Sequence, residues 1–546
     1  MLKVKNITKY YGNKKILNKI SFNLERANKV ALVGYNGTGK TTLLKMLAGI
    51  EKPDSGNIEI HKNCVLGFVP QDTEQFNSLN VFDYIKKTAL SEKIINQKQQ
   101  DVFDRNIEIM FSGFALSSET KFKKIGDLSS GQKTKVFLTA VLLKNPDLML
   151  LDEPTNNLDL PALIWLEDFL KKTDSAFIIV SHDKKFLNNV CNKIFEIDWK
   201  ERTIQITNSK YLDYLINKAK EQSRQLQMHI LQKEERQRLR NLAETKQEQA
   251  EKGAKHQAKD NDRLLRGYYR DKAADSFHDA KIIYRRIKRM EEIKKPNLRG
   301  EFKIKIDPEI SPLDLNISIN DLICGYNDDK GDFSIGPINL QINFGEKICI
   351  LGLNGSGKTT FLKTFTEVIP KISGEMKIGS GVKIGNLMQE HESLPKKETL
   401  IGFMMKRVFS IDELGQKIPT ERSLLQNKLL HFGFDEDQVK NKISEISPGG
   451  RARLLLAYFS AMNVNTLILD EPTNHLDMEA QEALDQALSE FNGTIIVVTH
   501  DRFFVENYKH DFLYLIDGGI MSAVVDFKKY VDEMEKRARK LLRMIK

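Results

Sequence analysis

The stretch that decides the fold is Gly34-Tyr35-Asn36-Gly37-Thr38-Gly39-Lys40-Thr41. Its Gly-x-x-x-x-Gly-Lys-Thr spacing is that of a phosphate-binding loop, whose glycines let successive backbone N–H groups face phosphate oxygens. We expect Lys40 to reach the β- and γ-phosphates and the Thr41 hydroxyl to bind Mg²⁺. The apolar run 30–33 predicts a buried parallel strand before the loop, and residues 42–47 predict a helix whose N-terminus favours an anion. For a single motif, a chance glycine turn would be the alternative.

A second copy of the motif makes chance a poor explanation. It stands 318 residues later as Gly352-Leu353-Asn354-Gly355-Ser356-Gly357-Lys358-Thr359. The same offset maps four further residues onto the first copy, namely Gln389 onto Gln71, Ser447 onto Ser129, Asp470 onto Asp152 and His500 onto His182. An internal repeat of this length predicts two similar domains. We place them at residues 1–208 and 317–546, with residues 209–316 as a linker.

The segments between these landmarks predict α/β domains. Residues 148–151 form an apolar run that ends in Asp152-Glu153, and residues 177–180 form another that ends in Ser181-His182-Asp183. Helical stretches are expected from about Val81 and over residues 134–143. Strands that alternate with helices, with polar groups at the strand ends, are typical of a mostly parallel sheet that binds its ligand at that edge.

Composition and charge restrict the class of protein. The chain has 546 residues, four scattered cysteines and a net charge of +10. Residues 209–300 contain 24 Lys/Arg and 14 Asp/Glu, so this segment alone carries +10. A local basic excess usually meets a polyanionic partner. The cysteine spacing favours neither disulfides nor a zinc site, and no signal peptide or membrane-spanning run is seen, so we expect a cytoplasmic protein.

The linker predicts an antiparallel helical hairpin. Two helical patterns occur in it, at Leu212, Leu215, Ala219, Leu226 and Ile230 and at Ala273, Phe277, Ala280, Tyr284 and Ile287, and Pro296 ends the second. About 40 helical residues would span on the order of 60 Å and carry a tip near residues 252–270 away from the domains. A solvated charged coiled coil is the alternative, but the charge excess favours RNA contact. The tip residues expected to bind RNA are Lys252, Lys255, Lys259, Arg263, Arg266, Tyr268, Tyr269 and Arg270.

The ordered motifs resemble a known family. The phosphate loop, Gln71, Ser129-Ser130-Gly131-Gln132, Asp152-Glu153-Pro154-Thr155-Asn156 and Ser181-His182-Asp183 resemble an ABC-type ATPase domain, and the second copy repeats the series. Two such domains on one chain without membrane spans, each with Glu-Pro-Thr-Asn-x-Leu-Asp, resemble the ABC-F group of translation factors. The implied fold is two tandem P-loop ABC-type ATPase domains joined by a long antiparallel α-helical hairpin.

The resemblance implies head-to-tail pairing of the two domains, so that each ATP lies between one phosphate loop and the other domain's Ser-x-Gly turn. Tyr11 and Tyr326 are candidate adenine platforms, although a strand-end tyrosine is the plain alternative for Tyr11. The expected ATP-binding residues are Tyr11, Gly34, Asn36, Gly37, Gly39, Lys40, Thr41, Thr42, Ser129, Gly131, Tyr326, Gly352, Asn354, Gly355, Gly357, Lys358, Thr359, Thr360, Ser447 and Gly449. The expected Mg²⁺ residues are Thr41, Gln71, Asp152, Thr359, Gln389 and Asp470.

Hydrolysis needs a carboxylate that orients water and a group that senses the γ-phosphate. Glu153 and Glu471 suit the first role, and His182 and His500 suit the second. A plain helix cap is the alternative for the acidic pair, but the histidine in both copies argues against it. The copies differ in two places, since Asn157 stands opposite His475 and Pro448-Gly449-Gly450 replaces Ser130-Gly131-Gln132. Unequal hydrolysis at the two sites is therefore expected.

Three functions compete at this point. The first is a ribosome-associated ATPase whose hairpin inserts near transfer RNA and ribosomal RNA, as a translation factor or as a protein that displaces an antibiotic. The second is the subunit that energises a separate membrane transporter, which rarely needs a basic hairpin. The third is a DNA-repair ATPase, whose coiled coil usually interrupts the ATPase fold. Members of the resembling family that carry an extra arm have it between the positions of Gln71 and Ser129, and because that interval equals the one from Gln389 to Ser447, no arm is expected here. Residues 536–546 predict a short basic terminal helix.

Overall fold

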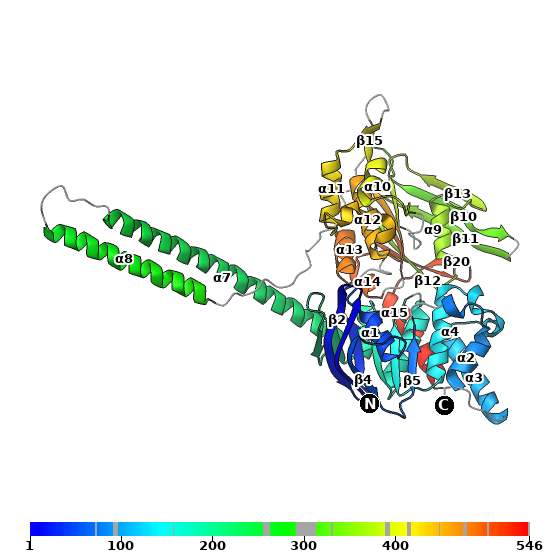
Figure 1. Ribbon diagram of the computed structural model, residues 1–546. Coiled ribbons are helices and arrows are strands. Elements are labelled where there is room, and N and C mark those ends of the chain that lie inside the picture. The colour runs from blue at the N-terminus through cyan, green and yellow to red at the C-terminus, as the bar shows by residue number, and fades with distance from the viewer. Residues whose placement is uncertain are drawn as a thin grey trace. The chain divides into compact units, whose positions relative to one another are not determined.

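The computed structural model describes the chain except residues 71–73, 91–96, 157, 255–262, 291–312, 329–330, 388–393, 412–416, 447, 473–477, 500–501 and 544–546, together with the side chains of some residues next to these gaps. Two compact units are present (Figure 1). One comprises Met1–Tyr211 and Glu301–Lys546, and the other comprises Leu212–Gly300.

The first domain of the larger unit is built on a six-stranded sheet in the order β5-β6-β7-β3-β8-β9. Its neighbouring strands are parallel except for β8 and β9. A separate antiparallel sheet has the order β2-β1-β4. The strands are β1 (Leu2–Tyr11), β2 (Lys14–Leu24), β3 (Lys29–Val33), β4 (Ser55–Ile60), β5 (Leu66–Val69), β6 (Leu148–Asp152), β7 (Ala176–Val180), β8 (Lys193–Ile197) and β9 (Ile204–Thr207).

The second domain repeats this arrangement, with the orders β14-β17-β18-β12-β19-β20 and β11-β10-β13 and an added hairpin, β15-β16. Its strands are β10 (Ile317–Asp328), β11 (Gly331–Ile342), β12 (Lys347–Gly352), β13 (Ser373–Ile378), β14 (Ile384–Leu387), β15 (Phe409–Ile411), β16 (Lys417–Pro419), β17 (Thr466–Asp470), β18 (Thr494–Val498), β19 (Phe512–Asp517) and β20 (Ile520–Ala523). The central strands β6 and β7 match β17 and β18 at the predicted offset of 318 residues. The prediction of two tandem α/β domains is confirmed.

Helices follow the strands as the sequence pattern indicates. In the first domain they are α1 (Lys40–Leu47), α2 (Val81–Leu90), α3 (Gln97–Gly113), α4 (Ser130–Leu143), α5 (Leu160–Lys172) and α6 (Lys184–Val190). In the second they are α9 (Lys358–Phe365), α10 (Leu400–Arg407), α11 (Arg422–His431), α12 (Pro448–Ala461), α13 (Met478–Glu490), α14 (Arg502–Asn507) and α15 (Phe527–Leu542). The predicted helices after Val81 and over residues 134–143 correspond to α2 and α4.

The central strands are apolar on both faces. Every residue of β6 and of β7 is buried, and the same holds for β17 and β18. Such continuous burial is expected when helices cover both faces of a parallel sheet. It leaves the C-terminal strand edge as the place where polar side chains can emerge, and Asp152 and Asp470 end β6 and β17 there.

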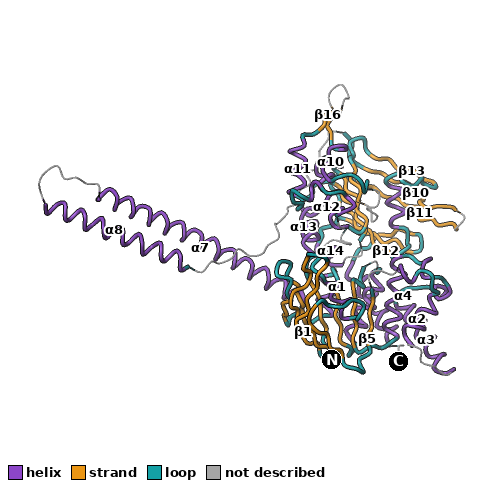
Figure 2. The backbone as a smooth tube through the Cα atoms, viewed as in Figure 1, coloured by secondary structure: helices purple, strands orange, loops and turns teal. Residues whose placement is uncertain are grey.

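The smaller unit is a pair of helices, α7 (Tyr211–Ala254) and α8 (Arg263–Arg289), that lie side by side (Figure 2). At 1.5 Å per residue, the 44 residues of α7 span about 66 Å. Arg236 donates a hydrogen bond to the carbonyl of Met290 at 2.8 Å, and Lys246 pairs with Asp279 at 3.1 Å. These contacts define an antiparallel register in which the second half of α7 lies beside α8.

The seam of this hairpin differs from the predicted heptad. Ala273 and Ala280 are buried as expected, but Phe277 and Tyr284 are 57% and 42% exposed. On α7 the buried residues Leu239, Ala243 and Ala250 face the seam, whereas Ile230 is exposed. Small residues on both helices allow a close approach that leaves no room for large rings, so the aromatic side chains lie outside.

The last helix is also longer than predicted. The sequence predicted a short basic helix over residues 536–546, but α15 begins at Phe527, where the Asp526 side chain caps it by accepting a hydrogen bond from the N–H of Lys529 at 3.1 Å. Phe527 and Tyr530 pack against the apolar core of the second domain, and the body of the helix packs on α5 and α3 of the first. Within the described ranges, no helix combines the length and apolar character of a membrane-spanning segment.

Candidate nucleotide-binding sites

The first phosphate loop connects β3 to α1. Gly39, at the N-terminal end of α1, has a φ of +96°, and a Cβ there would come within 2.7 Å of Ile16 Cγ2. Only glycine fits both conditions. The Lys40 side chain is mostly buried and donates hydrogen bonds to the carbonyls of Gly34 at 2.7 Å and Tyr35 at 3.2 Å. The loop therefore holds its lysine at the start of the helix, where an anion is favoured.

The second phosphate loop, between β12 and α9, has the same construction. Lys358 Nζ lies 2.9 Å from the carbonyls of both Gly352 and Leu353. Burial lowers the pKa of Lys358, while the nearby carboxylates Glu471 and Asp470 oppose that change. Gly357 has a φ of +100°, which nearly equals that of Gly39. The two loops are thus structural equivalents.

A buried aspartate ends the central strand next to each loop. Burial raises the pKa of Asp152 to about 6, and the nearby Thr41 hydroxyl opposes that rise. No hydrogen bond of normal geometry reaches either of its buried carboxylate oxygens from the described residues. In the second copy the Thr359 hydroxyl donates to Asp470 Oδ2 at 2.8 Å. Burial raises the pKa of Asp470 as well.

These groups fit a magnesium ion. A buried carboxylate without a partner is costly unless a cation compensates it, and a hydroxyl beside a carboxylate supplies the oxygen ligands that Mg²⁺ prefers. No cluster of three or more His, Cys, Asp or Glu side chains that could hold a metal occurs in the described part of the chain. Mg²⁺ is commonly held by only one or two carboxylates together with substrate phosphates, so this pattern is the expected one. Gln71 and Gln389 lie outside the described residues.

The predicted catalytic glutamates have an unusual backbone. Glu153 and Glu471 have φ values of +51° and +50°, in the left-handed region. Their N–H groups donate to the carbonyls of Val180 at 3.0 Å and Val498 at 2.9 Å, so the chain turns sharply just beyond the strand. This conformation costs roughly 1–2 kcal/mol at a residue other than glycine. Its recurrence in both copies indicates a positional requirement on the carboxylate.

The structure brings one glutamate and one histidine together. His182 Nε2 lies 3.0 Å from Glu153 Oε1, and both side chains are largely buried. A carboxylate at this distance orients the imidazole and fixes which nitrogen carries the proton. His500, the counterpart of His182, lies outside the described residues.

The Ser-x-Gly turn begins a helix in each copy. The Ser129 hydroxyl accepts a hydrogen bond from the N–H of Gln132 at 3.3 Å, and the Gln132 side chain accepts one from the N–H of Ser129 at 3.1 Å. This is a capping box. In the second copy, α12 starts at Pro448, a residue suited to the first helical position, and Gly450 replaces the glutamine. Ser447 lies outside the described residues, and Gly449 is buried.

The two candidate adenine platforms differ in their surroundings. Tyr11 is 51% exposed, its hydroxyl donates to Glu51 at 2.8 Å, and Lys9 Nζ lies 5.7 Å from its ring centroid. Tyr326 is 46% exposed and stacks on Phe333 with 5.5 Å between ring centroids. Each ring retains exposed surface that could meet a base.

One residue near the sites had not been assigned a role from the sequence. Asp159 caps α5 and forms a buried ion pair with Lys135 at 2.8 Å. Its Oδ2 atom also accepts a long hydrogen bond, 3.4 Å, from the N–H of Asn354 in the second phosphate loop. Asp159 therefore links the first domain to the second loop, whereas the Ser129 hydroxyl, among the described residues, bonds only within its own turn. The available signal was the recurrence of Leu-Asp as Leu476-Asp477.

Fold and site together define a twin P-loop nucleotide-binding protein, and comparison with known proteins specifies the family. The family model described as ABC transporter matches residues 17–156 and 335–474. ABC transporter F family member 2 of Arabidopsis thaliana is 30% identical, with 99% of this chain and 80% of that protein covered. ATP-binding protein Uup of Buchnera aphidicola is also 30% identical, with 93% and 79% covered.

Among solved structures, the fold is similar to that of the archaeal ribosome recycling factor aABCE1, crystallised with the ribosomal stalk protein aP1. The TM-score is 0.60 at 18% identity, with 97% of this chain and 92% of that chain covered. The chain belongs to the ABC transporter family and, within it, to the ABC-F group. It is an ATP-binding protein that hydrolyses ATP.

Proposed function

We propose that this ATPase acts on the ribosome, inserting its helical hairpin near transfer RNA and ribosomal RNA to modulate translation or to displace an antibiotic. The observation that carries the proposal is the charge distribution, since residues 209–300 hold a charge equal to the whole net charge of +10 and Leu212–Gly300 form a separate unit. The ribosomal context of the recycling factor that shares this fold supports it. The protein would then work in the cytoplasm, as a single chain whose two ATPase domains pair with each other.

The hairpin offers side chains suited to RNA. Lys252, Tyr268 and Arg270 are exposed, and Lys272 Nζ lies 5.8 Å from the Tyr268 ring centroid. Cations neutralise phosphates, and exposed rings stack on bases. Arg263, Arg266 and Tyr269 belong to α8, although their side chains lie outside the description, as do Lys255 and Lys259 altogether.

At each ATP site, we propose the following division of work. Glu153 and Glu471 orient the attacking water, and His182 and His500 sense the γ-phosphate. Thr41, Gln71 and Asp152 would hold Mg²⁺ at one site, and Thr359, Gln389 and Asp470 at the other. The ion neutralises charge on the phosphate oxygens when bound. Ser447 and Gly449 would complete the site of the first phosphate loop, and Ser129 and Gly131 would complete the site of the second.

Ribosome binding should depend on the nucleotide state. The two ends of the hairpin segment continue into different ATPase domains, so closure of the domains on ATP changes how the ends are held. We expect ribosomes to co-sediment with an ATP-trapped variant more than with the apo or ADP-bound protein. Equal co-sedimentation in all three states would contradict the coupling, and no binding in any state would favour a different partner, such as a transporter.

Removing positive charge at the tip should weaken ribosome binding and flatten its salt dependence, because fewer counterions are released. The test variant carries alanine in place of Lys255, Lys259, Arg263, Arg266 and Arg270. Tyr268→Ala should instead cost roughly 1–3 kcal/mol with little change in the salt slope. Affinity is measured across a salt series in an ATP-trapped background.

The matched control for this experiment removes five exposed lysines from the first domain, Lys3, Lys19, Lys62, Lys86 and Lys87. Both five-residue variants lose the same charge, so a difference between them isolates the position of the charge. Basal ATP hydrolysis should survive in the tip variant, because the tip and the phosphate loops belong to different compact units. If tip and control variants bind ribosomes equally well, the hairpin has no special RNA-contacting role.

A further inference from the structure

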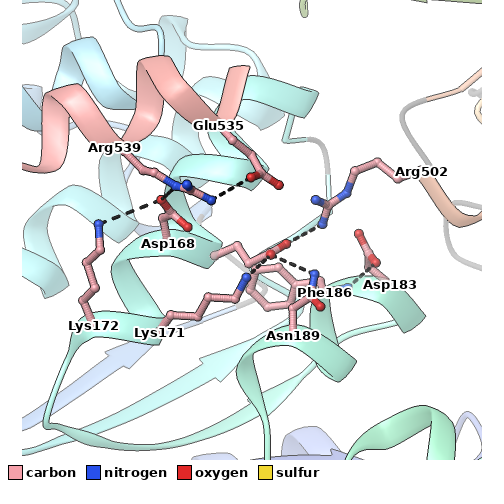
Figure 3. A network of polar contacts seen from close by, with 10 residues as sticks. Asp168, Lys171, Lys172, Asp183, Phe186, Asn189, Arg502, Glu535 and Arg539 are labelled. Carbon is pink, nitrogen blue, oxygen red and sulfur yellow. Dashed lines mark hydrogen bonds and ion pairs between the residues drawn. The ribbon is translucent and has the colours of Figure 1, made fainter. Parts of the chain in front are cut away.

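A buried arginine of the second domain inserts into the first domain. Arg502, the first residue of α14, is 1% exposed, and its Nη2 atom donates to Glu167 Oε2 at 2.6 Å (Figure 3). Glu167 lies on α5 and is itself 3% exposed. A buried charge needs a partner, so this pair joins the two domains at a fixed point.

The same guanidinium also influences a second carboxylate, the half-buried Asp183. Asp183 caps α6 by accepting a hydrogen bond from the N–H of Phe186 at 2.7 Å. Burial raises the pKa of Asp183, and the charge of Arg502 opposes that rise. Arg502 therefore bonds directly to Glu167, and its charge also attracts Asp183, whose own drawn contact is with Phe186 (Figure 3).

The residues of this cluster lie next to the two proposed phosphate-sensing histidines in the chain. Asp183 follows His182 directly, and Arg502 stands two residues after His500. His182 in turn lies 3.0 Å from Glu153. The segment that follows each proposed phosphate-sensing histidine is thus tied to the other domain through a single ionic cluster.

Neighbouring contacts hold the carboxylate side of the cluster in place. Glu167 Oε1 accepts hydrogen bonds from Lys171 at 2.6 Å and from Asn189 at 2.8 Å. A more exposed ion pair between Lys185 and Glu506 also crosses between the domains. This second pair provides a natural control, because it also joins α14 to the first domain, through α6, without burial of the charge.

The residues that correspond to Arg502 and Glu167 in the other copy of the repeat carry charges of the same sign. At the offset of 318 residues, Arg502 corresponds to Lys184 and Glu167 corresponds to Asp485. A lysine at position 502 would therefore reproduce what the first copy already has. Arginine presents a planar fork of donors that can serve two carboxylates, which a lysine ammonium does less specifically.

We infer that Arg502 is a positioning residue that couples the two ATP sites, by tying the segment after the second histidine to Glu167 on α5 of the first domain, with a charge that also attracts Asp183 beside the first histidine. If ATP binding shifts one histidine segment, the other segment must then either move with it or resist the shift. The inference rests on the proposed histidine roles and does not depend on the ribosome.

Coupling is measured with the isolated full chain by calorimetric titration of MgATP, in a Glu153→Gln/Glu471→Gln background that preserves the nucleotide. The product of the two stepwise association constants is divided by the product of the single-site constants from Lys40→Ala and Lys358→Ala. Independent sites give a ratio of one. With Arg502 present we expect this ratio to differ from one by a factor of at least about five, which is the lower end of typical couplings between sites.

Arg502→Met should return the ratio to one, and Arg502→Lys should keep a large part of the difference between the ratio and one. Glu167→Gln is the second test if the methionine variant does not fold, and it should also reduce the ratio. Lys185→Ala should leave the ratio unchanged, which separates the buried cluster from a general loosening of the interface.

Three results would overturn the inference. They are a ratio of one with Arg502 intact, a ratio unaffected by both Arg502→Met and Glu167→Gln, or an equal loss in Lys185→Ala. If each phosphate-loop variant binds one ATP while the ratio is one, the coupling inference is refuted and the proposed ATP sites stand. If such a variant still binds two ATP molecules, the proposed ATP sites fall with it.

Discussion

Replacing Glu153 and Glu471 together by glutamine is expected to slow steady-state ATP hydrolysis by about 10²–10⁴-fold. Glutamine keeps the size of the side chain but cannot accept a proton from the attacking water. Both glutamates directly follow a central strand in the same left-handed conformation, so both copies should depend on the carboxylate in the same way. Phosphate release at saturating ATP measures the effect.

ATP binding should persist in this double variant, because neither phosphate loop is altered. Glu59→Gln, which changes an exposed glutamate on β4, is the control and should hydrolyse ATP at the parent rate. The two single variants report how much each site contributes to ATP hydrolysis. We expect unequal contributions, because a capping box at Ser129 begins α4 in the first copy whereas Pro448 begins α12 in the second. Near-parental turnover in the double variant would contradict the catalytic assignment.

Gly357→Ala should destabilise the second domain and abolish ATP binding there. The φ of +100° imposes backbone strain on alanine, and the new Cβ would come within 2.7 Å of Phe333 Cζ and closer still to the buried side chain of Ile335. Strain and overpacking together predict a loss of about 2–6 kcal/mol in the free energy of unfolding. Denaturant titration measures the stability, and nucleotide titration in a Lys40→Ala background measures the second site.

Gly355→Ala provides the matched comparison in the same loop. Its φ of +78° is also left-handed, but a Cβ there meets no atom within 4 Å. This variant should show only the strain, about 1–3 kcal/mol. Similar losses in the two variants would mean that the contacts of Gly357 with Phe333 and Ile335 are not what requires glycine at that position.

The local parts of the fold could be predicted because their signals are local. The phosphate loops, the apolar runs that became β6 and β7 and the helix α4 each depend on residues adjacent in the chain. The common offset of the motifs then predicted a second, similar domain, and the two six-stranded sheets have equivalent strand orders. Spacing between short motifs was sufficient for the fold class.

Features that depend on distant contacts could not be predicted in this way. The heptad spacing of the second linker helix placed Phe277 and Tyr284 in the seam, but both are exposed, whereas the alanines Ala243, Ala250, Ala273 and Ala280 are buried. The left-handed φ of Glu153 leaves no trace in residue type. The pairing of Arg502 with Glu167 joins residues 335 positions apart, and no local pattern marks such partners.

The separation of Glu167 from Arg502 also has a consequence during synthesis of the chain. At about 5–20 residues per second, roughly 15–70 s pass between the addition of the two residues. For that time the first domain can form its sheet, yet Glu167 lacks the cation that later pairs with it, and the faces of α5 and α3 that receive α15 stay open. The nascent protein must therefore keep this surface clear of other contacts until its own last helices emerge.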